Sequence, residues 1–469
     1  MSFPTERRPA DLLIIGGGPA GIQASRMVKS AQPDWRVAVI RPEDHSIVYC
    51  ALPYAIEGLF PLKRTFKEDA LVTGNGTELI RGRVSSLDVD GMRVSLDDGR
   101  SLPYERLMIA TGALPLIPPI PGVTKENVFT VKTAEDAQRI LERLSLASVG
   151  VAEHPEERVG AARQKAVVIG SGAIGIEQAV AYAANGLEVH LVEMRCHVLP
   201  NLLDAEMAAE PLAELERLGI HVHLDRGLEA LEGDSAVRRV RLSGGESVTL
   251  DPLRDFVVVA VGMTPDIGFL EAGGFEQTKD GLVVDEHMRT TVPGVWAAGD
   301  CAAGRSGIDG RPLGGKLATN AVPMAKVAAR DILGQEATYP GFYNGAVTIV
   351  GALRVGGTGF TEAFARSRDL VVIPSIADTT ARFPMMPEPG HVRIKLVIEQ
   401  ATQRIVGAQV VGTEAVAERI DLLTFAIQTG ATTSDLARLS YSAQPWQTFF
   451  PARNAIVEAA SAAAAGEIG

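Results

Sequence analysis

The sequence contains two glycine-rich turns whose spacing suits the binding of a dinucleotide pyrophosphate. In the pattern G-x-G-x-x-G the glycines let the backbone approach the phosphates, and the following helix offers free N–H groups to their negative charge. The glycines of the two turns lie 154 residues apart: Gly16, Gly18 and Gly21, and then Gly170, Gly172 and Gly175. One such pattern is weak evidence, but two in the same strand–turn–helix–strand context predict two dinucleotide sites.

Acidic residues near these turns indicate which nucleotides bind. Glu193 stands 18 residues after Gly175, where a carboxylate accepts hydrogen bonds from ribose hydroxyls and repels a 2′-phosphate, so NADH is favoured over NADPH. Arg41 occupies the corresponding position after the first turn, so either Glu43 takes over the ribose or Arg41 contacts a phosphate. Asp300, at a glycine turn after an apolar strand, suits a hydrogen bond from the ribityl chain of a flavin.

The three cysteines, Cys50, Cys196 and Cys301, are far apart in the sequence. This spacing argues against a disulfide scaffold, a cysteine-rich zinc site and a four-thiolate iron–sulfur cluster, but it allows a single working thiol. We expect Cys196 and Cys301 to be packing residues. His221 and His223 share one strand face and could bind a metal. Because no third ligand lies nearby in the sequence, we predict an ordinary exposed strand and no metal site.

The hydrophobic pattern around each turn predicts a β-α-β unit. The first unit has expected strands over 11–15 and 35–40 around a helix that ends near Ser30, and the second has strands over 166–169 and 187–193 around a helix that ends near Asn185. Further apolar strands are expected over 107–112 and 256–262, with a loop or linker over 146–165. From about Tyr339 the pattern becomes typical of an α+β domain, with strands over 347–350, 370–373, 392–398 and 405–411, helices over 413–429 and 433–439, and an alanine-rich tail.

Length and charge limit the remaining possibilities. A chain of 469 residues suggests about three domains. The net charge of −12, without a long run of Lys or Arg, argues against binding to nucleic acid or an anionic membrane surface. No apolar stretch approaches the ~20 residues that span a bilayer, and Leu12–Ile15 is too short for the core of a secretory signal. We therefore expect a cytoplasmic protein without membrane insertion.

Along nearly its whole length the chain resembles the FAD- and NAD(P)H-dependent pyridine nucleotide–disulfide oxidoreductases. The resemblance rests on the segments GGGPAG (16–21), ATG (110–112), GSGAIGIE (170–177), VGMTPD (261–266) and AAGDCA (298–303). It implies an α/β fold with two Rossmann-like domains, one for FAD and one for NAD, plus a C-terminal α+β dimerisation domain that makes the protein a homodimer. The implied boundaries are 1–125 and 290–335 for the FAD domain, 126–289 for the NAD(P)H domain and 336–469 for the dimerisation domain.

The resemblance also implies which residues bind the cofactors. Those for FAD are Gly16, Gly18, Pro19, Ala20, Gly21, Arg41, Glu43, Val84, Thr111, Gly112 and Asp300. Those for NADH are Gly170, Gly172, Ala173, Ile174, Gly175, Glu177, Glu193 and Gly262, with Glu177 near the nicotinamide. The family also implies that the stretch around Asp300 joins the N-terminal FAD segment in space.

The segment SIVYCALPY (46–54) is similar to that of the single-cysteine branch of the family, which includes coenzyme A-disulfide reductases, NADH oxidases and peroxidases, and CoA-persulfide reductases. Cys50, 29 residues after Gly21, matches the redox-active cysteine of that branch. Pro19 and Ala20 stand where peroxidases have a histidine. Gln444 begins QPWQTF in place of the H-P-x-x-x-E dyad of the two-cysteine enzymes, and Tyr441 resembles the interface tyrosine of coenzyme A-disulfide reductases.

This resemblance implies an NADH-dependent flavoprotein reductase that passes electrons through FAD and Cys50 to a small-molecule disulfide or persulfide, with coenzyme A as the candidate carrier. Tyr441 would protonate a leaving thiolate. One alternative is an NADH oxidase that reduces oxygen. Another is an electron-transfer reductase for a rubredoxin- or ferredoxin-type partner, in which Cys50 has no redox role.

Overall fold

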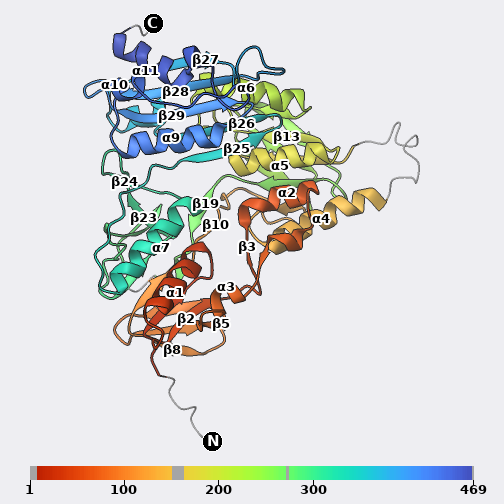
Figure 1. The fold of residues 1–469 in the computed structure, drawn as a ribbon. Coiled ribbons are helices and arrows are strands. Elements are labelled where there is room, and N and C mark those ends of the chain that lie inside the picture. The colour runs from red at the N-terminus through yellow and green to blue at the C-terminus, as the bar shows by residue number, and fades with distance from the viewer. Residues whose placement is uncertain (1–7, 150–162, 271–273, 467–469) are drawn as a thin grey trace, which may run out of the picture. The chain divides into compact units, whose positions relative to one another are not determined.

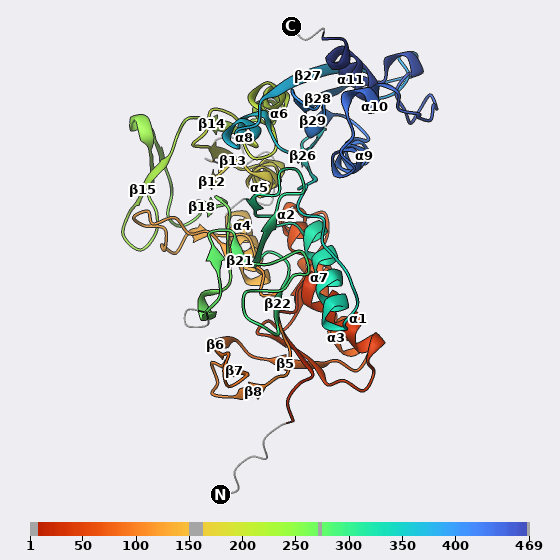
Figure 2. The same cartoon turned by 90° about the vertical axis from the view of Figure 1, so that its left-hand side faces the viewer.

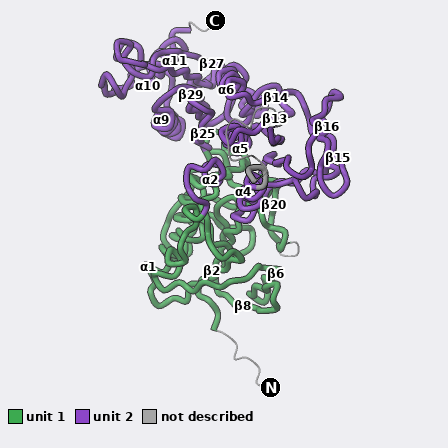
Figure 3. Tube along the Cα trace, turned by 90° about the vertical axis from the view of Figure 1, so that its right-hand side faces the viewer, with its two compact units in different colours: residues 1–49, 63–114, 263–342 green, residues 50–62, 115–262, 343–469 purple. Residues whose placement is uncertain are grey.

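A computed structural model describes residues 8–149, 163–270 and 274–466 of the chain (Figure 1). The fold is mixed α/β and divides into two compact units, coloured separately in Figure 3. Unit 1 consists of residues 1–49, 63–114 and 263–342, and unit 2 of residues 50–62, 115–262 and 343–469. No helix in the described ranges is long and apolar enough to cross a membrane.

Unit 1 is built on a parallel five-stranded sheet in the order β22-β9-β1-β2-β5. The strands are β22 (Val295–Ala297), β9 (Leu107–Ile109), β1 (Leu12–Ile15), β2 (Val37–Arg41) and β5 (Glu78–Arg81). Every residue of β1 and β2 is buried, as expected for a parallel sheet covered on both faces. β22 pairs with β9, which confirms that the stretch before Asp300 joins the N-terminal segment.

Two long helices pack against each other in unit 1, as Figures 1 and 2 show: α1 (Pro19–Ala31) and α7 (Ala318–Ile332). Small sheets and short helices complete the unit. They are β3 (Ser46–Ile47), β4 (Phe66–Lys67), η2 (Leu62–Thr65), α3 (Ala70–Thr73), β6 (Val84–Asp88), β7 (Arg93–Leu96), β8 (Ser101–Pro103), β10 (Ala113–Pro115), β19 (Met263–Pro265), η5 (Gly268–Leu270), β20 (Gln277–Thr278), β21 (Gly281–Val283), β23 (Ala302–Arg305) and β24 (Pro312–Leu313).

Unit 2 contains a second parallel sheet in the order β11-β18-β12-β13-β14. Its strands are β11 (Val128–Phe129), β18 (Phe256–Val259), β12 (Lys165–Ile169), β13 (Glu188–Val192) and β14 (His221–His223). The helices of this part are α2 (Leu52–Glu57), after η1 (Tyr49–Ala51), α4 (Ala134–Val149), α5 (Ala173–Ala184) and α6 (Ala205–Arg217). A small antiparallel sheet holds β15 (Leu228–Glu232), β16 (Arg239–Leu242) and β17 (Ser247–Thr249), with η4 (Ser243–Gly245) between the last two.

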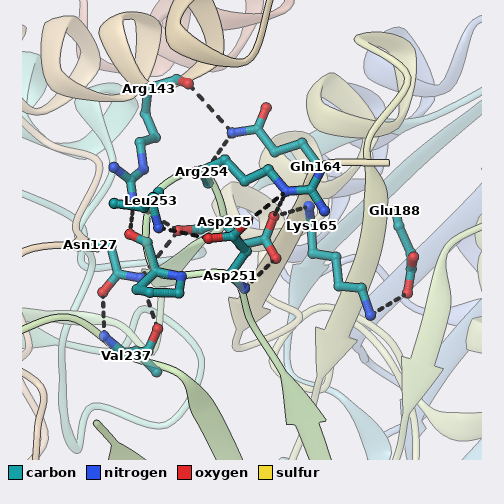
Figure 4. Close-up of polar contacts among 11 residues, drawn as sticks. Asn127, Arg143, Gln164, Lys165, Glu188, Val237, Asp251, Leu253, Arg254 and Asp255 are labelled. Carbon is teal, nitrogen blue, oxygen red and sulfur yellow. Dashed lines mark hydrogen bonds and ion pairs between the residues drawn. The ribbon is translucent and has the colours of Figure 1, made fainter. Parts of the chain in front are cut away.

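A buried carboxylate anchors the start of this second sheet (Figure 4). Asp255, 1% exposed, accepts hydrogen bonds from the backbone N–H groups of Lys165 at 2.9 Å and Asp251 at 2.8 Å. Gln164 bridges α4 to the same region, because its amide donates to the carbonyls of Arg254 at 2.6 Å and Arg143 at 3.4 Å. A buried charge held by several donors fixes the position of β12, which leads into the second glycine turn.

The C-terminal part of unit 2 is an antiparallel sheet in the order β25-β26-β29-β28-β27. The strands are β25 (Ala346–Val350), β26 (Leu353–Gly359), β27 (Val372–Thr379), β28 (Val392–Glu399) and β29 (Ile405–Gly412). The helices are α8 (Glu362–Ser367), α9 (Val416–Gln428), α10 (Thr433–Ala437) and α11 (Ala455–Ala465), with η6 (Pro451–Arg453) before the last. Helix α9 packs on β26 and β29, and α11 packs on β27 and β28.

The structure corrects one expectation and adds detail to two others. Residues 146–149 belong to α4 rather than to a linker, while 150–162 lie outside the described residues. The alanine-rich tail forms α11, because Asn454 caps it and its alanines are strong helix formers that pack into the core. Residues 263–270 and 274–289, which the sequence analysis placed in the NAD(P)H domain, are grouped with unit 1. The three domain boundaries stay predictions.

Candidate active site

The first glycine turn has the geometry of a pyrophosphate cradle. A Cβ atom on Gly16 would lie 2.1 Å from the Ala110 carbonyl oxygen, and one on Gly21 would lie 1.9 Å from the Gly16 carbonyl oxygen. A Cβ atom on Gly18 would meet no protein atom within 4 Å. The first and third glycines are thus required by strand and helix packing. The second leaves open space at the start of α1, where a ligand's phosphates can approach the backbone.

The second glycine turn repeats this arrangement in unit 2. A Cβ atom on Gly170 would lie 2.6 Å from the Ala260 carbonyl oxygen, and one on Gly175 would lie 1.9 Å from the Gly170 carbonyl oxygen. Gly172 again faces open space. The two turns therefore offer the same kind of anion site at the starts of α1 and α5.

Glu193 lies directly after β13 and is 6% exposed. Its carboxylate accepts hydrogen bonds from Ser171 N–H at 3.0 Å, Ser171 Oγ–H at 2.7 Å and Arg195 N–H at 2.9 Å. Since Ser171 lies inside the second glycine turn, these bonds hold the carboxylate beside the expected pyrophosphate position. That is the placement which ribose recognition requires.

Arg41 has protein partners for its charge. It is 2% exposed, and its guanidinium donates to the carbonyl of Glu43 at 3.0 Å and to Asp69 Oδ1 at 2.5 Å. Burial raises the pKa of Asp69, but hydrogen bonds from Arg81 and Arg41 outweigh this and lower it. Arg41 thus fixes the loop that carries the exposed Glu43.

Glu43, Asp300 and Tyr49 share one electrostatic neighbourhood in unit 1. Burial first, and then the charges of Glu43 and Asp300, raise the pKa of Tyr49 to about 12, against the opposing charge of Arg41. The two acids that the sequence analysis assigned to ribose and ribityl recognition therefore both act on one phenol, which stays protonated and can donate a hydrogen bond.

The cysteine-bearing segment packs on the helix of the second glycine turn. Cys50 is exposed in η1, directly before α2. Tyr54 on α2 donates its O–H to Glu177 Oε1 on α5 at 3.3 Å, and Thr348 on β25 donates to the same oxygen at 2.8 Å. Asn185 also donates to the Ile56 carbonyl at 3.3 Å. These contacts fix α2 relative to α5.

Burial sets the protonation of this group of side chains. Burial raises the pKa of Glu177, although the hydrogen bonds from Thr348 and Tyr54 oppose the shift. Burial, then Glu177, then Cys50 raise the pKa of Tyr54 to about 12. Tyr54 therefore remains a hydrogen-bond donor at neutral pH, and its phenol lies within electrostatic reach of Cys50.

Two family models match the chain, one over the nucleotide-binding part and one over the C-terminal part. The model described as pyridine nucleotide-disulphide oxidoreductase matches residues 10–325, and the model for the dimerisation domain of the same family matches residues 346–448. The chain belongs to the pyridine nucleotide-disulphide oxidoreductases. It is therefore an NAD(P)H-dependent oxidoreductase that uses FAD and NADH.

Relatives of this oxidoreductase are similar over almost their full length. An NADH oxidase of Methanocaldococcus jannaschii is 32% identical, and the match covers 92% of this chain and 94% of the relative. An NAD(P)H coenzyme A polysulfide/persulfide reductase of Pyrococcus horikoshii is 30% identical, with 92% and 93% covered. The solved structure of an NAD-dependent persulfide reductase from A. fulgidus matches with a TM-score of 0.89 at 29% identity, covering 97% of this chain and 83% of that chain.

The remaining residues that the family resemblance implied occupy defined places. Pro19 and Ala20 begin α1, and Ala173 and Ile174 begin α5. Val84 is partly buried at the start of β6. The other three assigned residues lie in loops: Thr111, Gly112 and Gly262. Thr111 donates to the Asp266 carbonyl at 2.6 Å, Gly112 accepts from Asp266 N–H at 3.0 Å, and Gly262 accepts from Leu116 N–H at 2.9 Å. The cofactor roles of these residues stay predictions.

Three other expectations have different outcomes. Cys301 is buried, and its thiol donates to the Ala298 carbonyl at 3.4 Å, so its predicted packing role is confirmed. Cys196 is exposed, so the packing role predicted for it is wrong. Tyr441 is 41% exposed, and its hydroxyl donates to the Pro451 carbonyl at 2.7 Å. Its predicted role as a proton donor stays a prediction.

The sequence analysis assigned no role to Tyr54 or Thr348. Tyr54 lies four residues after Cys50 on a short helix, and this spacing is a signal that could have pointed to it. Thr348 carries no local signal, because its contact with Glu177 joins positions 171 residues apart.

Proposed function

We propose that this oxidoreductase reduces a small-molecule disulfide or persulfide, with coenzyme A as the thiol carrier, at the sulfur of Cys50. The observation that carries the proposal is the exposed Cys50 just before α2. Tyr54 of α2 donates a hydrogen bond to Glu177 on α5, the helix of the second glycine turn, and so holds this segment there. The names of the Pyrococcus horikoshii and A. fulgidus relatives support a persulfide substrate.

The two glycine turns would hold the cofactors. The open space at Gly18 suits the pyrophosphate of FAD and that at Gly172 suits NADH, with Glu193 accepting from the NADH ribose and disfavouring a 2′-phosphate. Asp300 and Glu43 would accept from the ribityl chain and the ribose of FAD. FAD, when bound, supplies the two-electron chemistry that connects NADH to sulfur.

Cys50 would act by thiol–disulfide exchange through a mixed disulfide. Its thiolate attacks a disulfide, forms a bond to one sulfur and releases the other as a thiolate, which takes up a proton. Two electrons from NADH then cleave the mixed disulfide and regenerate the Cys50 thiolate, while the second thiol leaves with a proton. The net reaction consumes one NADH and one proton and yields two thiols. In the homodimer, Tyr441 would be the proton donor to the leaving thiolate.

The matched dimerisation domain supports the homodimer, and light scattering at working concentration would test it. The cytoplasmic location expected from the sequence stays a prediction.

A second candidate is an NADH oxidase that reduces oxygen. The 32% identical relative from Methanocaldococcus jannaschii carries that name. Rapid aerobic consumption of NADH without any added thiol substrate would favour it.

Anaerobic titration of the FAD-loaded protein with NADH tests the role of Cys50. The protein is first treated with coenzyme A disulfide, so that Cys50 carries a mixed disulfide. The wild type should then use about two electrons to cleave this bond before the flavin absorbance bleaches, whereas Cys50→Ser should bleach from the first addition. Cys196→Ser is the matched control, because Cys196 is also exposed, and it should behave as the wild type. Identical bleaching of the wild type and Cys50→Ser would contradict the proposal and favour electron transfer to a protein partner.

A further inference from the structure

Three histidines and two glutamates meet on one face of the parallel sheet of unit 2. His190 on β13 pairs in register with His221 on the edge strand β14, and the two rings stack with centroids 4.9 Å apart. His223, two residues further along β14, lies with its Nε2 3.0 Å from Nδ1 of His190. The sequence showed two of these histidines, and the third comes from the neighbouring strand.

In His190 and His223, the ring nitrogen that faces the other histidine is the inner nitrogen, and the second one is the outer nitrogen. A carboxylate lies within hydrogen-bond distance of each outer nitrogen. Nε2 of His190 lies 3.1 Å from Glu188 Oε1, and Nδ1 of His223 lies 3.1 Å from Glu246 Oε2. Each carboxylate also has a cation. Lys165 Nζ lies 3.2 Å from Glu188 Oε1, as Figure 4 shows, and Arg226 Nε lies 2.9 Å from Glu246 Oε1.

The protons on these groups leave the contact between His190 and His223 without a simple hydrogen bond. Hydrogen bonds from His223 and Arg226 lower the pKa of Glu246. Burial raises the pKa of Glu188, but hydrogen bonds from His190 and Lys165 outweigh this and lower it, so both groups accept hydrogen bonds as carboxylates. Each ring must then place an N–H at its outer nitrogen. If both rings are neutral, the two inner nitrogens face each other across 3.0 Å with lone pairs only. A cation between them removes this repulsion.

A proton is one such cation, but burial opposes it. The side chains of His190 and His223 are only 13% and 21% exposed. Burial lowers the pKa of His190, with the neighbouring His221 and His223 adding to the shift and Glu188 opposing it. The two inner nitrogens face each other across 3.0 Å, which is the arrangement of two ligands on one cation.

We propose that His190 Nδ1 and His223 Nε2 are ligands of a divalent transition-metal site, for which zinc is the natural occupant. In tetrahedral zinc sites with Zn–N distances of about 2.0–2.1 Å, two nitrogens lie about 3.3 Å apart, so the pair needs to open by only a few tenths of an ångström. Glu188 and Glu246 complete the carboxylate–histidine–metal arrangement that orients ligand histidines.

A third ligand and water would complete the coordination. His221 is exposed and stacked on His190, and its ring would have to rotate about the side-chain torsions to become the third ligand. Water takes the fourth position. Because β14 is the edge strand, a bound metal would cross-link it to β13.

Calorimetric titration of the FAD-loaded, chelator-treated protein with zinc chloride tests the proposal. The parent protein carries Cys50→Ser and Cys196→Ser, since these exposed thiols would bind zinc themselves. It should bind one equivalent, with affinity falling from about pH 8 to about pH 6, because protons compete for the same nitrogens. Zinc should also raise its melting temperature. Glu188→Gln should weaken binding by about 10–100-fold, the usual cost of losing a carboxylate behind a ligand histidine.

Matched histidine variants decide the assignment. His190→Gln/His223→Gln should abolish this equivalent, and the single His223→Gln should weaken it if the double variant does not fold. His391→Gln should bind as the parent does, because His391 has a carboxylate partner, Glu210, but lies outside the cluster. Absence of zinc binding to the parent overturns the proposal, and so does unchanged binding by folded His223→Gln.

Discussion

Thr348 Oγ1 donates a hydrogen bond to Glu177 Oε1 across 2.8 Å, joining the C-terminal antiparallel sheet to the helix of the second glycine turn. Tyr54, four residues after Cys50, donates to the same oxygen. One carboxyl group therefore receives contacts from the cysteine-bearing segment and from the C-terminal sheet. This makes Glu177 the meeting point of three parts of unit 2.

We predict that Glu177 makes stability depend on pH. Burial raises its pKa, so the folded state binds the proton more tightly than the unfolded state. Stability is therefore lost as the pH rises from the ordinary value of 4.5 through the raised one. Glu177→Gln keeps an acceptor oxygen and carries no charge. Its melting temperature relative to the wild type should be higher by about 2 °C at neutral pH than in mild acid, and calorimetry at both pH values would measure this. A difference that does not change with pH would refute the prediction.

The two glycines of the second turn should respond differently to alanine. Gly172→Ala adds a methyl group to open space, so the protein should fold normally while its KM for NADH rises about tenfold, equal to about 1.4 kcal/mol of binding. Gly175→Ala forces a Cβ atom to within 1.9 Å of the Gly170 carbonyl oxygen and should destabilise the fold by about 1–3 kcal/mol. Steady-state kinetics and thermal unfolding distinguish the two. Equal melting-temperature losses in both variants would show that Gly172 is also a packing residue.

Asp69 should matter for FAD retention through Arg41. Asp69→Asn leaves the buried Arg41 guanidinium without its carboxylate. Because Asp69 is itself 42% exposed, the expected cost is about 1–3 kcal/mol rather than the larger cost of a fully buried pair. The loop carrying Glu43 should loosen, and the ratio of flavin to protein absorbance after purification should fall. Asp98→Asn, which removes an exposed partner of Arg100, is the control and should retain FAD fully.

Lys395 is fully buried and holds three carboxylates together. Its Nζ lies 2.8 Å from Asp204 Oδ2 and 2.8 Å from Glu362 Oε2, and it also contacts Glu206. Lys395→Met removes the charge but keeps the apolar stem, so the carboxylates should repel one another and the loss should reach about 3–5 kcal/mol. Thermal or chemical unfolding at neutral pH measures it. A neutral or stabilising effect would show that the methionine packs well enough to replace the network.

The same network predicts an acid limit to stability. Burial raises the pKa of Asp204, but its hydrogen bonds with Lys395, the Glu362 backbone and Gln409 outweigh this and lower it. A lowered pKa contributes stability above the ordinary value of 3.8, and this contribution is lost as the pH falls through the folded-state pKa. Asp204→Asn should therefore lose stability at neutral pH and show a flatter decline in acid than the wild type. Parallel acid-unfolding curves would contradict this.

The sequence by itself determined the parts of the protein that rest on local pattern. The two glycine turns, their flanking strands and helices, and the acid of the second turn were all predicted, because each depends on residues close together in the chain. The family of the enzyme followed from the same segments. The residues at which helices and strands end were predicted less well, as at the end of α4. The run of alanines at the C-terminus reads as a low-complexity tail until Asn454 caps it and the sheet covers it.

Only the tertiary structure decided which distant side chains meet. The sequence placed Arg41 near a nucleotide, and this role stays a prediction. It did not show that Asp69, 28 residues away, binds the charge of Arg41 within the protein. His221 and His223 lacked a third imidazole in the sequence, and the parallel pairing of β13 with β14 supplied His190. Glu177 found Tyr54 and Thr348 at separations of 123 and 171 residues. A local pattern carries no record of such pairs, because sheet register and helix packing bring them together.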